Sequence, residues 1–260
     1  MSKTVLITGA STGIGYELAK LFAKDKYELI IIARNETKLS ETASFLIKDY
    51  NVKVKFIPKD LSEPDSAKEI FDELKKENIS IDMLVNNAGF GDQGAFADSD
   101  MKNDIEMISL NISSLVILNR LFLNDMLKRN SGRIMNVAST AAFQSGPFMA
   151  VYYASKAFVL SFSEAVSEEL TGTNVTVCCL CPGPTETEFQ NRAGIKKTKM
   201  MSGKRFTVMT AEEVALTGYN EMMKGKRIII PGFANKAGAF IVRFIPRKII
   251  TKITRSLNSK

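Results

Sequence analysis

The stretch TVLITGASTGIG, residues 4–15, decides the fold of this chain. Its first five residues form an apolar strand pattern, and a helical pattern over residues 14–25 overlaps the last glycine. A glycine turn between a first strand and a first helix is where α/β domains hold the phosphates of a dinucleotide. Glycines allow close backbone approach there, and the helix N-terminus offers unpaired N–H groups. The spacing is G-x-x-x-G-x-G, whereas G-x-G-x-x-G is the common form, and we expect cofactor contacts from Gly9, Ser11, Thr12, Gly13, Ile14 and Gly15.

Strand and helix patterns alternate along the rest of the chain. Seven short, mostly apolar runs are typical of strands buried on both faces, at residues 4–8, 28–33, 52–57, 83–86, 132–138, 175–180 and 227–230. Helical patterns lie between them, one of them after Pro64 up to about Glu77 and the others at residues 14–25, 36–50, 99–129, 150–170 and 211–223. This alternation predicts a single Rossmann-type, doubly wound α/β domain over residues 1–260, with a seven-stranded parallel sheet and helices on both faces.

The composition narrows the chemistry. The 260 residues include no histidine, which excludes a Ser-His-Asp triad and any histidine metal site. The three cysteines, Cys178, Cys179 and Cys181, share one expected strand, so we expect reduced thiols and no metal. The first strand pattern begins at once, without a signal peptide, and no apolar run approaches the length of a membrane span. We therefore expect a cytoplasmic protein.

The positive charge of the chain belongs to its C-terminal part. Of the net charge of +7, residues 222–260 supply ten Lys and Arg with no Asp or Glu, which leaves −3 for the remainder. We therefore expect no nucleic-acid partner. In the basic C-terminal tail, residues 233–260, an amphipathic pattern places Ile249, Ile250, Ile253 and Leu257 on one helical face. That face could contact an anionic membrane surface, an acyl-carrier partner or a neighbouring subunit, but packing on the chain's own domain is favoured over the membrane.

A second segment lacks any clear pattern. Residues 186–207 form a long polar stretch that contains several lysines and arginines. Stretches of this length are often lids over a site, or simply mobile. We expect a substrate lid here, whose basic residues could attract the phosphate of an acyl-CoA or of an acyl carrier.

Two cations follow the second strand pattern. Arg34 lies 19 residues beyond the last glycine of the turn. An acidic residue at this point would hold the ribose 2′-hydroxyl of NAD, whereas an arginine can bind the 2′-phosphate of NADP. Lys38, one helical turn further on, could add charge. The alternative is that both are solvated surface cations, and we favour NADP(H).

Further cofactor contacts are expected at two strand ends. Asp60 and Leu61 follow the third strand, and the Asp60 carboxylate could accept a hydrogen bond from the adenine amino group. Asn87, Ala88 and Gly89 follow the fourth strand, where they offer amides and a close-approach glycine. Both places lie at carboxyl ends of strands, where open α/β sheets bind ligands.

Tyr152 and Lys156 are four residues apart in a helical pattern, which places both side chains on one face of the helix. A nearby ammonium favours tyrosinate and so lowers the tyrosine pKa from about 10. Such a phenol can give a proton to a carbonyl oxygen as a hydride arrives, or take one in the reverse reaction. A tyrosine and a lysine at this spacing are usually a coincidence on a helix surface. The other motifs of the chain therefore determine whether the pair indicates catalysis.

Those motifs stand in a fixed order along the chain: TGxxxGxG at residues 8–15, NNAG at 86–89, Asn111, Ser139, YxxxK at 152–156, and Pro182-Gly183 after the sixth strand. With this set the chain resembles the short-chain dehydrogenase/reductase superfamily over essentially its whole length. The resemblance implies that Tyr152 is the acid/base and that Lys156 binds the nicotinamide ribose and lowers the Tyr152 pKa. It also implies that Ser139 donates to the substrate oxygen and that Asn111 holds a water for proton relay.

The resemblance carries expectations for the cofactor and for assembly. Pro182, Gly183, Thr185 and Thr187 would contact the nicotinamide or the pyrophosphate, together with Tyr152 and Lys156. Members of the superfamily are commonly homodimers or homotetramers, in which the helices expected here at residues 99–129 and 150–170 would pack across the dimer interface.

The stretch 87–96 and the tail resemble the subgroup of 3-oxoacyl and steroid-type carbonyl reductases. We therefore expect a small-molecule substrate, a hydrophobic ketone or a 3-oxoacyl thioester. An apolar pocket could be lined by Phe143, Phe148, Met149, Phe189, Met200 and Met201, although ordinary packing is favoured for most of them. Two alternatives stay open: a non-catalytic NADP(H)-binding sensor or scaffold, and a reductase of small sugars or aldehydes.

Overall fold

The computed structural model describes residues 2–189 and 208–259. Its main feature is a seven-stranded, fully parallel sheet in the order β3-β2-β1-β4-β5-β6-β9. The strands are β1 (Thr4–Thr8), β2 (Glu28–Ala33), β3 (Val54–Pro58), β4 (Met83–Asn86), β5 (Gly132–Val137), β6 (Val175–Leu180) and β9 (Ile228–Ile229). The predicted sheet is therefore confirmed, although the last strand is only two residues long.

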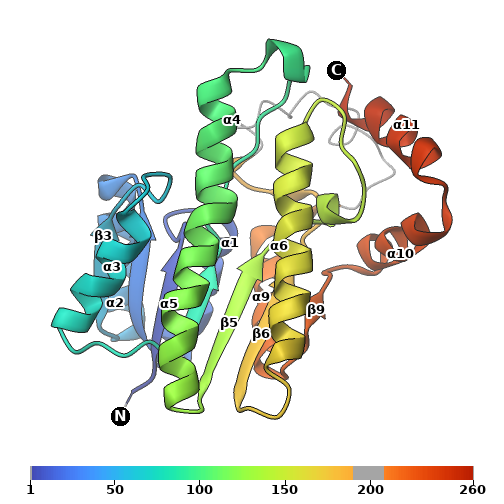
Figure 1. The fold of residues 1–260 in the computed structure, drawn as a ribbon. Helices are drawn as coiled ribbons and strands as arrows, with labels where there is room; N and C mark the ends of the chain where they lie inside the picture. Colours follow the sequence, from blue (N-terminus) through green and yellow to red (C-terminus); the bar gives the residue numbers. More distant parts are fainter. Residues whose placement is uncertain (1, 190–207, 260) are drawn as a thin grey trace.

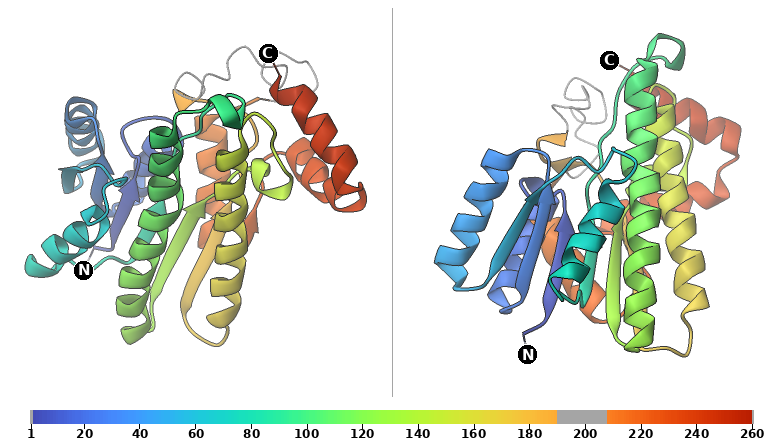
Figure 2. Two further views of the ribbon diagram at one scale, coloured as in Figure 1. Left: turned by 45° about the horizontal axis from the view of Figure 1, so that its top comes forward. Right: turned by 60° about the vertical axis from the view of Figure 1, so that its left-hand side comes forward.

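Helices cover both faces of this sheet (Figures 1 and 2). One apolar core lies between the sheet and α1 (Gly13–Lys24), α2 (Glu36–Tyr50) and α9 (Ala211–Met223). A second core lies on the other face, with α3 (Ser66–Lys76), α4 (Met101–Ile108), α5 (Ser114–Lys128) and α6 (Ala150–Glu169). The single doubly wound domain expected from the alternation is therefore present.

The topology locates the ligand cleft. The chain first builds outward from β1 to β3 and then returns to place β4 on the other side of β1. Two crossovers therefore diverge from the carboxyl ends of β1 and β4. In open α/β sheets, ligands bind in the crevice that this reversal leaves.

The helix expected at residues 99–129 is one helical run from Met101 to Lys128, but it is not α-helical throughout. A π-helical segment, Ser109–Ser113, separates α4 from α5 and contains Asn111. Such segments occur frequently at functional sites. By length and composition alone this run could cross a membrane. In this fold, residues such as Leu118 and Phe122 are buried in the core beside the sheet.

A buried polar network ties this helical layer to the sheet. The Asn136 side chain on β5 is completely buried. It accepts hydrogen bonds from Asn86 Nδ2 (2.9 Å) and Asn119 Nδ2 (3.0 Å) and donates one to Ser163 Oγ (3.0 Å). Because these partners come from β4, α5 and α6, the network fixes how the helices sit on the sheet.

The C-terminal tail forms two helices joined by a short 3₁₀ turn. α10 (Phe233–Ile241), the turn (Val242–Phe244) and α11 (Arg247–Asn258) lie side by side beyond β9 (Figure 1). The end of α11 is anchored, because Asn258 Nδ2 donates to the Pro147 carbonyl (2.9 Å). The tail therefore packs on its own domain. The sequence pattern predicted α11 but not α10, and it also missed a small sheet of β7 (Thr185–Glu186) and β8 (Met209–Thr210).

Candidate active site

A cavity of about 710 Å³ lies at the carboxyl ends of the strands and brings together most of the residues predicted from the sequence. The predicted residues that line it are Gly9, Ser11, Thr12, Gly13, Ile14, Arg34, Lys38, Leu61, Asn87, Ala88, Gly89, Ser139, Tyr152, Lys156, Pro182, Gly183, Thr185 and Thr187. Gly15 and Asn111, which are buried, and Asp60, which is partly exposed, do not line it. One continuous cavity thus joins the glycine turn to the tyrosine–lysine pair.

The glycine turn is held against the end of β4 by hydrogen bonds. The Thr8 hydroxyl accepts from the backbone N–H groups of Asn87 and Ala88, both at 3.0 Å. Asn87 Nδ2 donates back to the carbonyls of Thr8 (3.0 Å) and Gly9 (3.1 Å). Gly9 has a φ of +67°, and a Cβ there would lie 2.8 Å from Asn87 Nδ2. Side chains are therefore excluded at this turn for reasons of both space and backbone conformation.

The turn and the start of α1 fit a dinucleotide phosphate. A Cβ on Gly15 would collide with the Gly9 carbonyl, so the helix starts in direct contact with the turn. Within the described residues, the Thr12 side chain makes no capping hydrogen bond to the first turn of α1. The N–H groups of that turn therefore remain available to an anion at the cavity.

The cations predicted to bind a 2′-phosphate lie at the cavity edge, each beside a carboxylate. Arg34 Nη1 is 3.2 Å from Asp60 Oδ2, and Lys38 Nζ is 2.7 Å from a Glu188 carboxylate oxygen. Partial burial raises the pKa of Asp60, but hydrogen bonds from Ser62 and Arg34 outweigh this effect and hold it below its usual value. Ion pairs this exposed contribute little stability, so a phosphate could compete for Arg34.

Tyr152 and Ser139 lie together at one corner of the cavity. Tyr152 is on the first turn of α6 and is 9% exposed, whereas Ser139 follows the end of β5. Burial raises the pKa of the Tyr152 hydroxyl well above its ordinary value, and a hydrogen bond with Ser139 offsets only part of this rise. The Ser139 hydroxyl also accepts from the Ala141 N–H at 3.1 Å, which fixes its position.

Lys156 lies one helical turn beyond Tyr152 and is fully enclosed. Its ammonium donates to the Val137 carbonyl at 2.9 Å and lies 5.8 Å from the centre of the Tyr152 ring. Burial lowers the pKa of Lys156 to about 8. The sequence led us to expect that this amine lowers the Tyr152 pKa. The structure gives the opposite direction, because burial dominates and the amine is turned toward the strand end.

Asn111 connects the loop after β4 to α6. Its Nδ2 donates to the Phe90 carbonyl (2.9 Å) and to Ser155 Oγ (3.1 Å), and its Oδ1 accepts from the Phe90 N–H (3.1 Å). A Cβ on Gly89 would lie 2.9 Å from Asn111 Oδ1 and 3.3 Å from Lys156 Nζ. The π-helical segment therefore brings Asn111 close to Lys156, while its role in a proton relay stays a prediction.

The loop after β6 closes over the glycine turn. Thr185 Oγ1 donates to the Gly183 carbonyl at 2.9 Å, which stiffens the loop. Thr187 passes above Gly13, where a Cβ would come within 3.1 Å of its methyl group. Most of the expected lid, including Met200 and Met201, lies outside the described residues.

Sequence reasoning missed that the tail forms one wall of the cavity. Ile250, Ile253, Thr254 and Leu257 of α11 line it, as do Ala239 and Val242. The apolar face of α11 was the available signal, but nothing in the pattern showed what it faces. Ile249, grouped with that face, is instead 51% exposed.

Only some of the residues predicted to line an apolar substrate pocket do so in the structure. Met149 and Phe189 line the cavity, whereas Phe143 packs in a core between the sheet and α6. Phe148 lines a separate small hollow and lies 5.8 Å from the Arg255 guanidinium. Tyr153 also lines the cavity, and its hydroxyl donates to Asn258 Oδ1 at 3.3 Å. This hydrogen bond connects α6 directly to α11 of the tail.

Comparison with known proteins places this site in a family. Residues 3–198 match the family model described as short chain dehydrogenase. The ketoacyl reductase HetN of Nostoc sp. is 34% identical over 181 residues, which cover 70% of this chain and 63% of that protein. The match therefore spans less than two thirds of that relative.

Two solved structures share the whole fold. A short-chain dehydrogenase from Sphingobium yanoikuyae in complex with NADPH superposes with a TM-score of 0.83 and 28% identity, covering 99% of this chain and 98% of that one. A short chain dehydrogenase/reductase from Burkholderia phymatum in complex with NAD gives a TM-score of 0.81 at 24% identity, covering 100% and 97%. With its glycine turn, tyrosine–lysine pair and parallel sheet, this chain belongs to the short-chain dehydrogenase family of oxidoreductases, whose fold binds a nicotinamide cofactor.

Proposed function

We propose that this chain is an NADP(H)-dependent reductase of hydrophobic ketones or 3-oxoacyl thioesters. The observation that carries the proposal is that Ser139, Tyr152 and Lys156 line the same cavity as the glycine turn. A binding module without turnover needs no such set of side chains. The bound nicotinamide would supply the hydride, and the chain supplies position and protons.

The proton chemistry starts from Tyr152. Because burial raises its pKa, the hydroxyl is protonated at neutral pH and can donate to a carbonyl oxygen. The Ser139 hydroxyl, beside it, would hydrogen-bond the same oxygen and stabilise its developing negative charge. Lys156, whose pKa burial lowers to about 8, could return a proton toward the tyrosine near neutral pH. The protonated phenol is the form that reduction requires, whereas the reverse reaction requires the tyrosinate.

The preference for NADP(H) rests on Arg34 and Lys38. Both lie at the cavity edge after β2, where a ribose 2′-phosphate would be placed. Guanidinium suits phosphate because it is planar, permanently charged and able to donate two parallel hydrogen bonds. On binding, the phosphate would replace the Asp60 carboxylate as the partner of Arg34.

The apolar wall supports a hydrophobic substrate rather than a small sugar. Ile250, Ile253 and Leu257 face the cavity from α11, and Met149 and Phe189 face it from other elements. Apart from the weakly accepting sulfur of Met149, these side chains offer no hydrogen-bonding group to a sugar hydroxyl. The similarity to a ketoacyl reductase agrees with this choice.

We propose that the chain assembles as a homodimer or homotetramer, and exposed apolar side chains on two helices support this. Ile105 (56% exposed) is on α4, and Phe158 (41% exposed) is on α6. These two helices contact each other on one face of the domain, so a second copy could cover both residues.

The test is an NADPH-oxidation screen with ketones, aldehydes and 3-oxoacyl thioesters. Tyr152→Phe should lower kcat/KM by at least about 100-fold, because the proton donor is removed while the ring stays. Tyr50→Phe is the matched control, since it removes a tyrosine hydroxyl outside the cavity and should retain the activity. Equal activity of Tyr152→Phe and the unmodified chain would refute the proposed mechanism.

A second experiment addresses the cofactor. Arg34→Asp should weaken or reverse the preference for NADPH over NADH, measured as the ratio of kcat/KM values. Arg227→Asp, an exposed arginine beyond the cleft, serves as the control. If the unmodified chain used both cofactors equally, the role given to Arg34 would be wrong.

A further inference from the structure

The outer side of the tail carries large apolar side chains that no described residue of the domain covers. Phe233 is 87% exposed, Phe240 60% and Phe244 72%. Phe240 and Phe244 contact each other, with ring centroids 5.1 Å apart. A group of exposed aromatic rings on neighbouring turns is unusual for a soluble surface and marks an interaction site.

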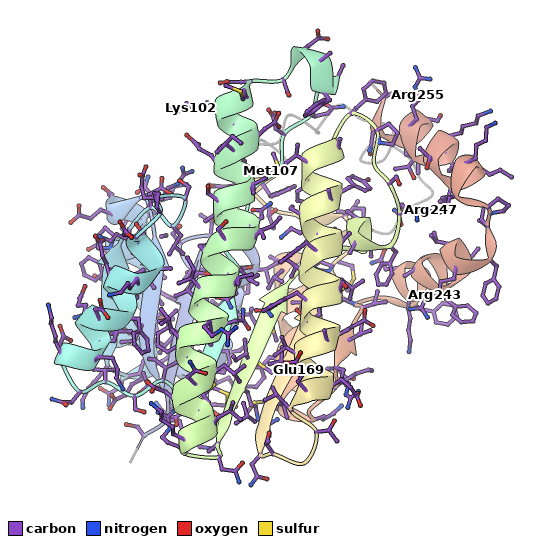
Figure 3. The ribbon with its side chains drawn as sticks, in the orientation of Figure 1. Lys102, Met107, Glu169, Arg243, Arg247 and Arg255 are labelled. Atoms are coloured by element: carbon purple, nitrogen blue, oxygen red, sulfur yellow. The ribbon has the colours of Figure 1, made fainter. Side chains whose placement is uncertain are left out.

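The tail is also strongly cationic. Lys236, Arg243, Arg247, Lys248 and Lys252 are exposed, and among the residues that the structure describes none of them forms an ion pair. Arg243 in the 3₁₀ turn and Arg247 and Arg255 in α11 lie at the edge of the molecule (Figure 3). No Asp or Glu occurs from residue 222 to the end of the chain.

We propose that the outer face of α10 and α11 is a docking surface for an anionic lipid bilayer. Exposed aromatic and aliphatic tips can enter the boundary between headgroups and acyl chains, while the lysines and arginines contact anionic headgroups. A bilayer accepts both kinds of side chain without requiring a shaped partner surface. We therefore choose an anionic bilayer as the partner, because its negative charge complements the lysines and arginines of the tail.

A second copy of this chain fits the surface less well. A two-fold contact through this face would place like charges opposite one another, with no carboxylate from the tail to compensate them. An acidic protein would pair the cations, but it would also need pockets for the exposed phenylalanine rings.

The inner face of the same helices lines the candidate active site. Ile253 is both part of the cavity wall and 45% exposed, so the cavity reaches the surface at the tail. Docking would place this side of the cavity beside the membrane, where apolar carbonyl compounds concentrate. Docking itself does not depend on the proposed reaction, whereas entry of substrate from the lipid side does.

The test is co-sedimentation of the full chain with vesicles of phosphatidylcholine alone and with phosphatidylglycerol added. Binding to the anionic vesicles should be strong at low salt and fall as salt rises. Arg247→Glu/Lys248→Glu should weaken it by at least about 25-fold, since each cation near an anionic surface contributes about fivefold. Lys48→Glu/Lys76→Glu, the same charge change on α2 and α3, should bind like the unmodified chain.

Replacing two of the exposed phenylalanines distinguishes a bilayer from other binding partners. Phe240→Ser/Phe244→Ser should reduce vesicle binding without changing the far-ultraviolet circular dichroism or the sedimentation coefficient. Unchanged vesicle binding by this variant would leave only charge attraction, as for an acidic protein, and would overturn the proposal. Dissociation of an oligomer by this variant, or no binding of the unmodified chain to anionic vesicles at low salt, would overturn it as well.

Discussion

Because Lys156 is buried, we can predict the sign and the magnitude of its effect on how the unfolding free energy depends on pH. Its pKa is about 8 in the folded chain, against an ordinary value of 10.5 for lysine. Below pH 8 the amine is protonated in both states, and the folded state bears the unfavourable burial of a charge. Between pH 8 and 10.5 the unfolded chain binds more protons than the folded one. The contribution of Lys156 to the unfolding free energy must therefore rise with pH in this window.

The perturbation is Lys156→Met, which removes the titrating group and keeps most of the apolar stem. From the two pKa values, the gain in unfolding free energy between pH 7 and pH 10 is about 2.5 kcal/mol. Methionine cannot show this gain. The difference between the two chains should therefore shift by about that amount in favour of the natural one as the pH is raised.

Urea unfolding at a series of pH values, without added nucleotide, measures this difference. Subtracting the two chains at each pH cancels the titration of all other groups, and Lys48→Met provides an exposed reference. A difference that stays constant from pH 7 to pH 10 would refute the assigned pKa. A shift of opposite sign would show that the folded state holds the charged amine favourably.

Two further predictions concern buried hydrogen bonds. Asn258→Ala removes the bonds to Tyr153 and Pro147, which should weaken the docking of α11 by about 1–3 kcal/mol and speed hydrogen exchange in that helix. Ser259→Ala is the control, and equal exchange in both variants would contradict the anchoring role. Asn136→Leu leaves three buried partners without their bonds and should lower the unfolding free energy by about 3 kcal/mol or more, measured by urea unfolding. A loss below about 1 kcal/mol would show that the network relaxes readily.

Much of the fold follows from local patterns. The bounds of β1, β2 and α2 were predicted to the residue. The two strands are apolar runs bordered by polar residues or glycine, and Asn35 caps α2 because its side chain accepts a hydrogen bond from the Lys38 N–H. α10 was missed because its sequence, FANKAGAFI, is short and rich in small residues, with Gly238, an unfavourable residue for a helix interior, near its end. The π-helical segment around Asn111 was missed too, since one extra residue in a turn leaves no periodic signal.

The site shows the same division between local and tertiary information. The ordered motifs identified Ser139, Tyr152 and Lys156, and the structure brings all three to one cavity. The direction of the Tyr152 pKa could not be predicted, because burial depends on the whole fold. The pairing of Arg34 with Asp60 was equally hidden, since the two residues meet only because β2 and β3 are neighbours in the sheet.

The bond between Gln93 and Asn258 joins positions 165 residues apart. Contacts across so long a loop form late, because closing the loop loses entropy before the contact repays it. The chain is a single domain, and domains generally fold as units. The docking of α11 on the loop after β4 should thus be among the last steps of folding, and this step completes the apolar wall of the cavity.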